Sequence, residues 1–204
     1  MMPGDRSPRS TCRARAFTSW QKSLGLPVLV ALLAAAISAF AQPTAERSIE
    51  LDGETLRFSV RTFAPDAHFS DPAAVLEPVS ALNTAKLLGR FLAAGASEDA
   101  AMLSNAPRRR FEVLREYQAS VGDEGFRKVF AEYFEPGNRV VAELAMGEHS
   151  LLVWHLREAN RYSGQFYVRV EGKVLMDDVP SQERVRLRRL LEAVRTGQLP
   201  LPAQ

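Results

Sequence analysis

The stretch that decides the fold is Arg139–Asp177, with the sequence RVVAELAMGEHSLLVWHLREANRYSGQFYVRVEGKVLMD. Much of it alternates apolar and polar residues with a period of two, which is typical of β-strands. The pattern predicts four strands, at 139–146, 150–157, 165–170 and 173–177. Since the connections between them are short, we expect each strand to pair antiparallel with the next.

The alternation in the second and third of these strands predicts which side chains share a face of the sheet. One face is expected to carry Leu152, Trp154, Leu156, Phe166, Val168 and Val170. The opposite face is expected to carry Leu151, Val153, His155, Tyr167 and Arg169. This assignment separates Trp154 from Tyr167.

Helical periodicity precedes the strands. Ser80 is expected to cap a helix that runs to about Ala94 and stops at Gly95. A short helix opens at Ser97, and a longer helical region follows Pro107 with a break at Gly122.

The two ends of the domain carry their own local signals. The pair Asp52-Gly53, between two alternating runs, predicts a β-hairpin because primed turns need positive φ at both central positions. Near the C-terminus, Ser181 is expected to cap a helix that ends at Gly197. Its apolar stripe is Leu187, Leu190, Leu191 and Val194.

This order of elements favours the α+β class, with helices on one face of an antiparallel sheet, an N-terminal β-hairpin and a C-terminal helix. The hairpin and an irregular connector occupy 42–79, the α+β domain occupies 80–197, and a tail occupies 198–204.

Two stretches resemble the nuclear-transport-factor-two-like superfamily, the cystatin-like cone. Leu87–Leu103 (LLGRFLAAGASEDAAML) is similar to the family's first helix, its glycine-containing break and its short second helix. Glu171–Val179 (EGKVLMDDV) is similar to its closing hairpin, with Val174 where an aromatic residue is usual. The resemblance covers about residues 80 to 180 and implies a curved, cone-like sheet with helices packed on it. The family holds both enzymes and non-catalytic pocket or adaptor domains, so fold alone selects no function.

The first 41 residues predict a signal peptide. A basic segment precedes the uncharged run Leu24–Phe40, which ends in Ala39-Phe40-Ala41 before Gln42. The alternative is an uncleaved anchor, but the run contains Pro27 and is shorter than the roughly 20 residues of a bilayer span. We therefore expect cleavage at about Ala41/Gln42 and a periplasmic or secreted protein.

Removal of this leader changes the charge of the chain. The full sequence has 26 Lys+Arg and 24 Asp+Glu, a net charge of +2 and a pI near 8.9. Without the leader, 21 basic and 23 acidic residues remain, a net charge of −2. No excess of positive charge is left for phosphates, so the composition argues against nucleic acid as a partner. The single cysteine, Cys12, lies in the leader, which excludes disulfides and thiol chemistry from the remainder.

The candidate catalytic residues are His155, Tyr167 and Asp177. In the dehydratases and isomerases of the superfamily, an Asp–His or Asp–Tyr pair acts as general acid and base, and a histidine titrates near neutral pH. The alternative for His155 is a half-buried strand residue bonded to a neighbour. The histidines show no metal-ligand spacing, so we expect no metal site and no cofactor.

Aromatic residues are concentrated in the middle of the domain. Phe130, Tyr133, Phe134 and Trp154 are candidates to line a pocket. Core packing explains most aromatic residues, but a hollow cone would also accept a small hydrophobic ligand. The preferred hypothesis is an exported non-enzymatic protein that binds an apolar ligand or an envelope protein there; a cofactor-free acid–base lyase or isomerase is the alternative.

Two arginine clusters remain, Arg108–Arg110 and the surface-basic group Arg184, Arg188 and Arg189. They could contact anionic lipid headgroups or an acidic partner, as an envelope adaptor would. The alternative is a solvated helix face with pairs such as Arg188–Glu192. The oligomeric state is not predicted by any of these features.

Overall fold

The computed structural model describes residues 44–69, 74–132, 134–135 and 137–201. The predicted signal peptide therefore lies outside the described residues. The described elements, in chain order, are β1 (Thr44–Leu51), β2 (Glu54–Thr62), α2 (Ala81–Ala93), α3 (Ser97–Ala101), α4 (Pro107–Glu132), β3 (Arg139–Met146), β4 (His149–Leu156), β5 (Arg161–Val170), β6 (Lys173–Met176) and α5 (Gln182–Arg195). The α+β class is confirmed.

The six strands form one antiparallel sheet in the order β1-β2-β3-β4-β5-β6. The N-terminal hairpin is confirmed, with φ of 52° at Asp52 and 76° at Gly53. Since β2 pairs with β3, this hairpin extends the same sheet as the predicted meander.

The helix boundaries follow their sequence signals closely. The Ser80 hydroxyl accepts a hydrogen bond from the Asn83 backbone N–H at the start of α2, and the Ser181 hydroxyl accepts one from Arg184 N–H at the start of α5. Gly122 interrupts α4 with φ 76° and ψ 165°, where the sequence predicted a break. Two helix starts and one kink are thus explained by local chemistry.

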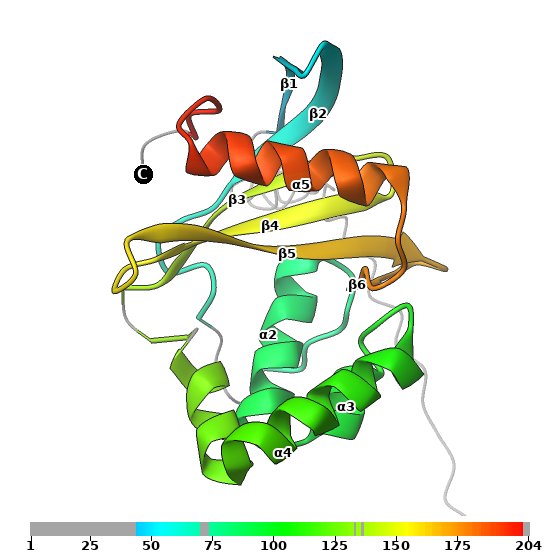
Figure 1. The fold of residues 1–204 in the computed structure, drawn as a ribbon, viewed down its shortest axis with the longest axis vertical. Helices are drawn as coiled ribbons and strands as arrows, with labels where there is room; N and C mark the ends of the chain where they lie inside the picture. Colours follow the sequence, from blue (N-terminus) through cyan, green and yellow to red (C-terminus); the bar gives the residue numbers. More distant parts are fainter. Residues whose placement is uncertain (1–43, 70–73, 133, 136, 202–204) are drawn as a thin grey trace, which may run out of the picture. The chain divides into compact units, whose positions relative to one another are not determined.

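The helices cover both faces of the sheet, a correction to the predicted single helical face (Figure 1). Side chains of α2, α3 and α4 pack with Val140, Leu152 and Trp154 in one buried cluster. Side chains of α5 pack with Leu144, Leu151 and Val153 in a second cluster. We call these the three-helix face and the α5 face. The last helix crosses to the far side because its own apolar stripe needs the strand face that the earlier helices leave open.

The predicted faces of β5 were wrong by one position. Leu152 pairs with Gln165 and Ser150 pairs with Tyr167, so Tyr167 shares the three-helix face with Trp154. Phe166 lies instead on the α5 face. The physical reason is the turn: β5 begins at Arg161, inside the predicted loop, and a register shift of one residue exchanges the faces of a whole strand.

Candidate functional site

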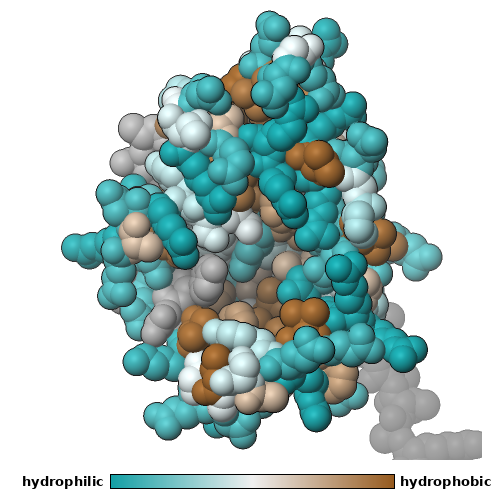
Figure 2. Space-filling view, in the orientation of Figure 1, coloured by the Kyte–Doolittle hydropathy of each residue, from teal (hydrophilic) through white to brown (hydrophobic). Residues whose placement is uncertain are grey.

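An apolar pocket lies between α2, α4 and the sheet, with a volume of about 200 Å³. It is lined by Ala85, Leu88, Gly89, Leu92, Arg110, Leu114, Phe130, Phe134, Gln165 and Met176. The residues from α2 recur at a spacing of three and four, so they form one helix stripe. In the space-filling view, apolar side chains gather between the sheet and α4 (Figure 2).

Gly89 allows the aromatic wall of this pocket to form. A Cβ atom at this position would lie 1.9 Å from Cε2 of Phe134, so the ring rests directly on the α2 backbone. The same ring packs edge-on against Trp154, with 5.7 Å between ring centroids. A larger residue at position 89 would therefore displace a wall of the pocket.

Gln165 supplies a hydrogen-bond donor to the pocket. Its Oε1 accepts from the Trp154 indole Nε1–H at 3.1 Å and from the Tyr167 hydroxyl at 2.8 Å. An indole N–H can only donate, so the amide oxygen must point toward Trp154 and the amide NH₂ must point away from it. Burial raises the pKa of Tyr167, which keeps its hydroxyl protonated as the second donor.

Arg110 supplies positive charge at the same pocket. Its Nε and Nη2 donate to the two carboxylate oxygens of Asp178 at 2.8 and 2.6 Å, a bidentate pair that fixes the guanidinium. The Ser104 hydroxyl donates to the same carboxylate at 2.6 Å. The third guanidinium nitrogen takes no part in this pair.

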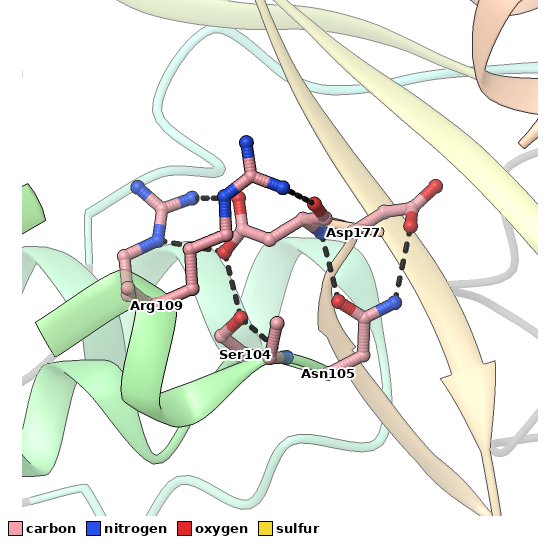
Figure 3. A network of polar contacts seen from close by, with 7 residues as sticks. Ser104, Asn105, Arg109 and Asp177 are labelled. Carbon is pink, nitrogen blue, oxygen red and sulfur yellow. Dashed lines mark hydrogen bonds and ion pairs between the residues drawn. The ribbon is translucent and has the colours of Figure 1, made fainter. Parts of the chain in front are cut away.

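A polar network holds these groups in place at the end of β6 (Figure 3). Asn105 donates from Nδ2 to Asp177 Oδ1 at 3.1 Å and accepts from the Asp178 backbone N–H at 2.8 Å. Asp177 is 2% exposed. The segment before α4 is thereby joined to the segment after β6, which positions Arg110.

The structure does not bring the three predicted catalytic residues together. His155 lies on the α5 side at the far end of β4 and packs its ring against Tyr162, with 5.3 Å between centroids. Tyr167 is buried on the other face and bonded to Gln165. Asp177 bonds to a different histidine, with 3.0 Å between its Oδ2 and Nδ1 of His149.

The predicted pocket residues are largely assembled. Phe130 and Phe134 line the pocket, and Trp154 supports it through Phe134 and Gln165. Tyr133 lies outside the described residues. Gln165 was not predicted, and Arg110 was predicted only as part of the cluster Arg108–Arg110, because their place at this pocket depends on strand register and on a carboxylate that is distant in the sequence.

The predicted surface-basic residues divide into two environments. Arg184 and Arg188 line a second cavity together with Arg109 and Arg110. Arg189 instead donates to Glu54 at 2.5 Å and to the Leu51 carbonyl, so it ties α5 to the N-terminal hairpin.

Within the described ranges, no group of three or more His, Cys, Asp or Glu side chains is placed to hold a metal ion. No helix among the same residues is long and apolar enough to cross a membrane. Comparisons with protein-family models, with curated proteins and with solved structures find no match to this chain. The superfamily resemblance therefore stays a prediction.

Proposed function

We propose that this chain is an exported, non-enzymatic binding protein whose apolar pocket takes a small hydrophobic molecule with one anionic or hydrogen-bond-accepting group. The observation that carries the proposal is the composition of the lining. Apolar side chains from two helices and the sheet surround the space, and two donors, Gln165 and Arg110, border it. A lining of this kind, mostly apolar with a few convergent polar groups, is typical of small-molecule sites.

The volume limits the ligand. A dry apolar cavity of about 150 Å³ in a protein binds benzene, and this pocket has about 200 Å³. A single ring or a short acyl chain is therefore the appropriate size. Removal of its apolar surface from water supplies most of the binding free energy, at about 25 cal/mol per Å².

The donors select the polar end of the ligand. The Gln165 amide NH₂ is turned away from Trp154 and makes no hydrogen bond with a described residue. Arg110 keeps the one guanidinium nitrogen that its pair with Asp178 does not use. A carboxylate can accept from both kinds of donor, and charge-assisted hydrogen bonds are the stronger ones.

A titration with hexanoate and its neutral counterpart hexanol tests the proposal. The indole N–H of Trp154 donates to Gln165, so its NMR resonance reports on any ligand that contacts this amide. We expect saturable shifts with both compounds and tighter binding of hexanoate, by about tenfold for one charge-assisted hydrogen bond. If neither compound shifts this resonance, the proposal fails.

Two substitutions separate the apolar and polar parts of the site. Ala85→Leu fills the pocket and should abolish binding of both compounds, whereas Ala119→Leu makes the same change on an exposed position of α4. Gln165→Glu keeps an acceptor for Trp154 and Tyr167 but replaces the donor with negative charge. It should weaken hexanoate far more than hexanol; equal effects on the two compounds would exclude the proposed role of Gln165.

The acid–base alternative now centres on His149 instead of His155. Buried Asp177 holds Nδ1 of His149, and its Nε2 lies 4.0 Å from a carboxylate oxygen of Glu183. A carboxylate that orients a histidine in this way is a recurring element of general acid–base sites. A lyase or isomerase of this type should accelerate a base-catalysed elimination such as ring opening of 5-nitrobenzisoxazole, with the rate lost in His149→Gln and retained in His155→Gln. Equal rates in both variants would exclude this alternative.

A further inference from the structure

A second cavity, of about 380 Å³, lies where α4 and α5 begin. Arg109 and Arg110 line it from α4, and Arg184 and Arg188 line it from α5. We call this the arginine cleft. Among the lining residues, Asp178 is the one that carries a carboxylate, so four guanidinium groups surround a single negative charge.

The carboxylate of Asp178 is already paired with an arginine of the cleft. Both carboxylate oxygens of Asp178 are bound by Arg110, and Arg109 reaches only the Asp178 backbone carbonyl, at 3.4 Å. The side chains of Arg184 and Arg188 form no ion pair with any residue that the structure describes. The guanidinium carbon of Arg184 lies 5.6 Å from the centroid of the Phe166 ring, and its Nε is buried without a hydrogen-bond partner there.

The other arginines of α5 show that this lack of partners is specific to the cleft. Arg186 and Arg189, on the same helix, both bond to Glu54 of the N-terminal hairpin, at 2.8 and 2.5 Å. Arg195 bonds to Glu192 at 2.7 Å. Among the residues that the structure describes, carboxylates thus pair with the arginines of α5 outside the cleft, and none pairs with Arg184 or Arg188 within it.

The helix dipole does not favour Arg109, Arg110 or Arg184, which lie in or next to the first turns of α4 and α5. The N-terminal end of a helix carries partial positive charge, so cations in its first turn are unfavourable. Two helices begin at this cleft, α4 at Pro107 and α5 at Gln182, and each places arginine in or next to its first turn. The same two ends present positive charge to any anion between them.

We propose that the arginine cleft binds a phosphate group carried by a small molecule. A guanidinium offers two parallel N–H donors that match two phosphate oxygens, which is why arginine clusters are typical of phosphate sites. The volume exceeds that of phosphate alone and leaves room for an organic portion. The ligand class is therefore a phosphomonoester, either soluble or the headgroup of a lipid. The inference goes beyond the proposed function, because it rests on Arg109, Arg184 and Arg188, which do not line the apolar pocket.

Calorimetric titration at constant ionic strength tests the proposal, with inorganic phosphate in one arm and dihexanoyl phosphatidic acid below its micelle concentration in the other. Constant ionic strength removes general screening as a cause of any difference. The cleft variants are Arg109→Gln and Arg188→Gln, both at exposed positions where the fold should be retained. The matched control is Arg108→Gln, which removes the same charge from the same helix turn outside the cleft.

We expect each cleft variant to weaken phosphate binding about tenfold, as for the loss of one charge-assisted hydrogen bond, and the control to change it less than about twofold. Binding of the phosphatidic acid much tighter than phosphate identifies a lipid headgroup if the cleft variants weaken it and Ala85→Leu, which fills the apolar pocket, does not; equal affinities identify a soluble phosphomonoester. Absence of binding in both arms, or equal weakening by Arg108→Gln, would overturn the proposal. Because all three variants leave the apolar pocket intact, hexanoate binding should be unchanged, so the two proposals fail independently.

Discussion

The two faces of the sheet bury similar apolar side chains but fill the space above them differently. On the α5 face, one helix lies directly on the strands, and Leu187 and Leu190 are fully buried. On the three-helix face, α2, α3 and α4 pack against the same strands but leave the apolar pocket between them. The three-helix face also carries two polar side chains: half-buried Gln165, which lines this pocket, and buried His68, which packs against Trp154.

A glycine on each face shows how this difference arises. A Cβ atom at Gly164 would lie 2.6 Å from Leu151 Cδ1 and 2.7 Å from Leu191 Cδ2, so two leucines close over the strand. Gly89 instead receives the edge of one half-buried ring, Phe134. On the α5 face, the leucine side chains close over the strand backbone. On the three-helix face, the single ring of Phe134 covers only part of the space above the sheet. The comparison indicates that the binding site lies where packing is incomplete.

The largest expected effect is a loss of unfolding free energy, which should differ between a leucine on the α5 face and a leucine on the three-helix face. Leu190→Ala leaves a new cavity in a filled layer and should cost about 4 kcal/mol of unfolding free energy. Leu88→Ala enlarges a space that already exists, so it should cost about 2 kcal/mol because fewer contacts are lost. Urea unfolding of both variants measures the difference, and equal losses would remove the contrast between the faces.

The two glycines give an intermediate effect. Gly164→Ala forces a methyl group into closed packing and should cost about 1 to 3 kcal/mol. Gly89→Ala should be nearly neutral in stability, because alanine gains about 1 kcal/mol in a helix and Phe134 can move outward. It should nevertheless weaken hexanoate binding, since the pocket wall moves. A large stability loss at Gly89, measured in the same urea experiment, would mean that Phe134 is held as firmly as the leucines opposite.

Local sequence signals predicted the elements well, because caps, turns and strand alternation act over a few residues. Ser80, Gly122, Asp52-Gly53 and Ser181 each lie at the predicted start, break or turn. The relative faces of β4 and β5 could not be obtained in this way. They depend on where pairing begins after the turn at Asn160, and one residue reverses the result.

The site was predictable only in part for the same reason. Phe130 and Phe134 could be found from their aromatic character and helix spacing. The pairs Arg110–Asp178 and His149–Asp177 join residues far apart in the chain, and many other pairings were equally compatible with the sequence. Which arginines obtain a carboxylate, and which line the cleft, is likewise decided by tertiary structure.

The smallest expected effect is a pH dependence of stability, which should arise from a buried histidine on the three-helix face. His68 is 1% exposed, packs against Trp154 with 5.7 Å between ring centroids, and has no hydrogen-bond partner for either ring nitrogen among the described residues. Burial lowers the pKa of His68, and the charge of Lys86 lowers it further. The unfolded chain therefore binds this proton more readily, so stability should fall as pH decreases below about 6.5.

Substitution His68→Phe should flatten this dependence while leaving unfolding near pH 8 little changed, because the ring there is neutral in both states. Melting temperatures of the two proteins across this pH range provide the measurement. A wild-type slope that persists in His68→Phe would assign the dependence to other groups.

Xenon tests the contrast between the faces most directly, because it enters dry apolar cavities and shifts the NMR resonances of the methyl groups that line them. We predict saturable shifts for the methyl groups of Leu88, Leu92 and Leu114 on the three-helix face, and no comparable shifts for Leu187, Leu190 and Val153 on the α5 face. Ala85→Leu should abolish the first set. Equal shifts on both faces, or none at the pocket leucines, would contradict the account.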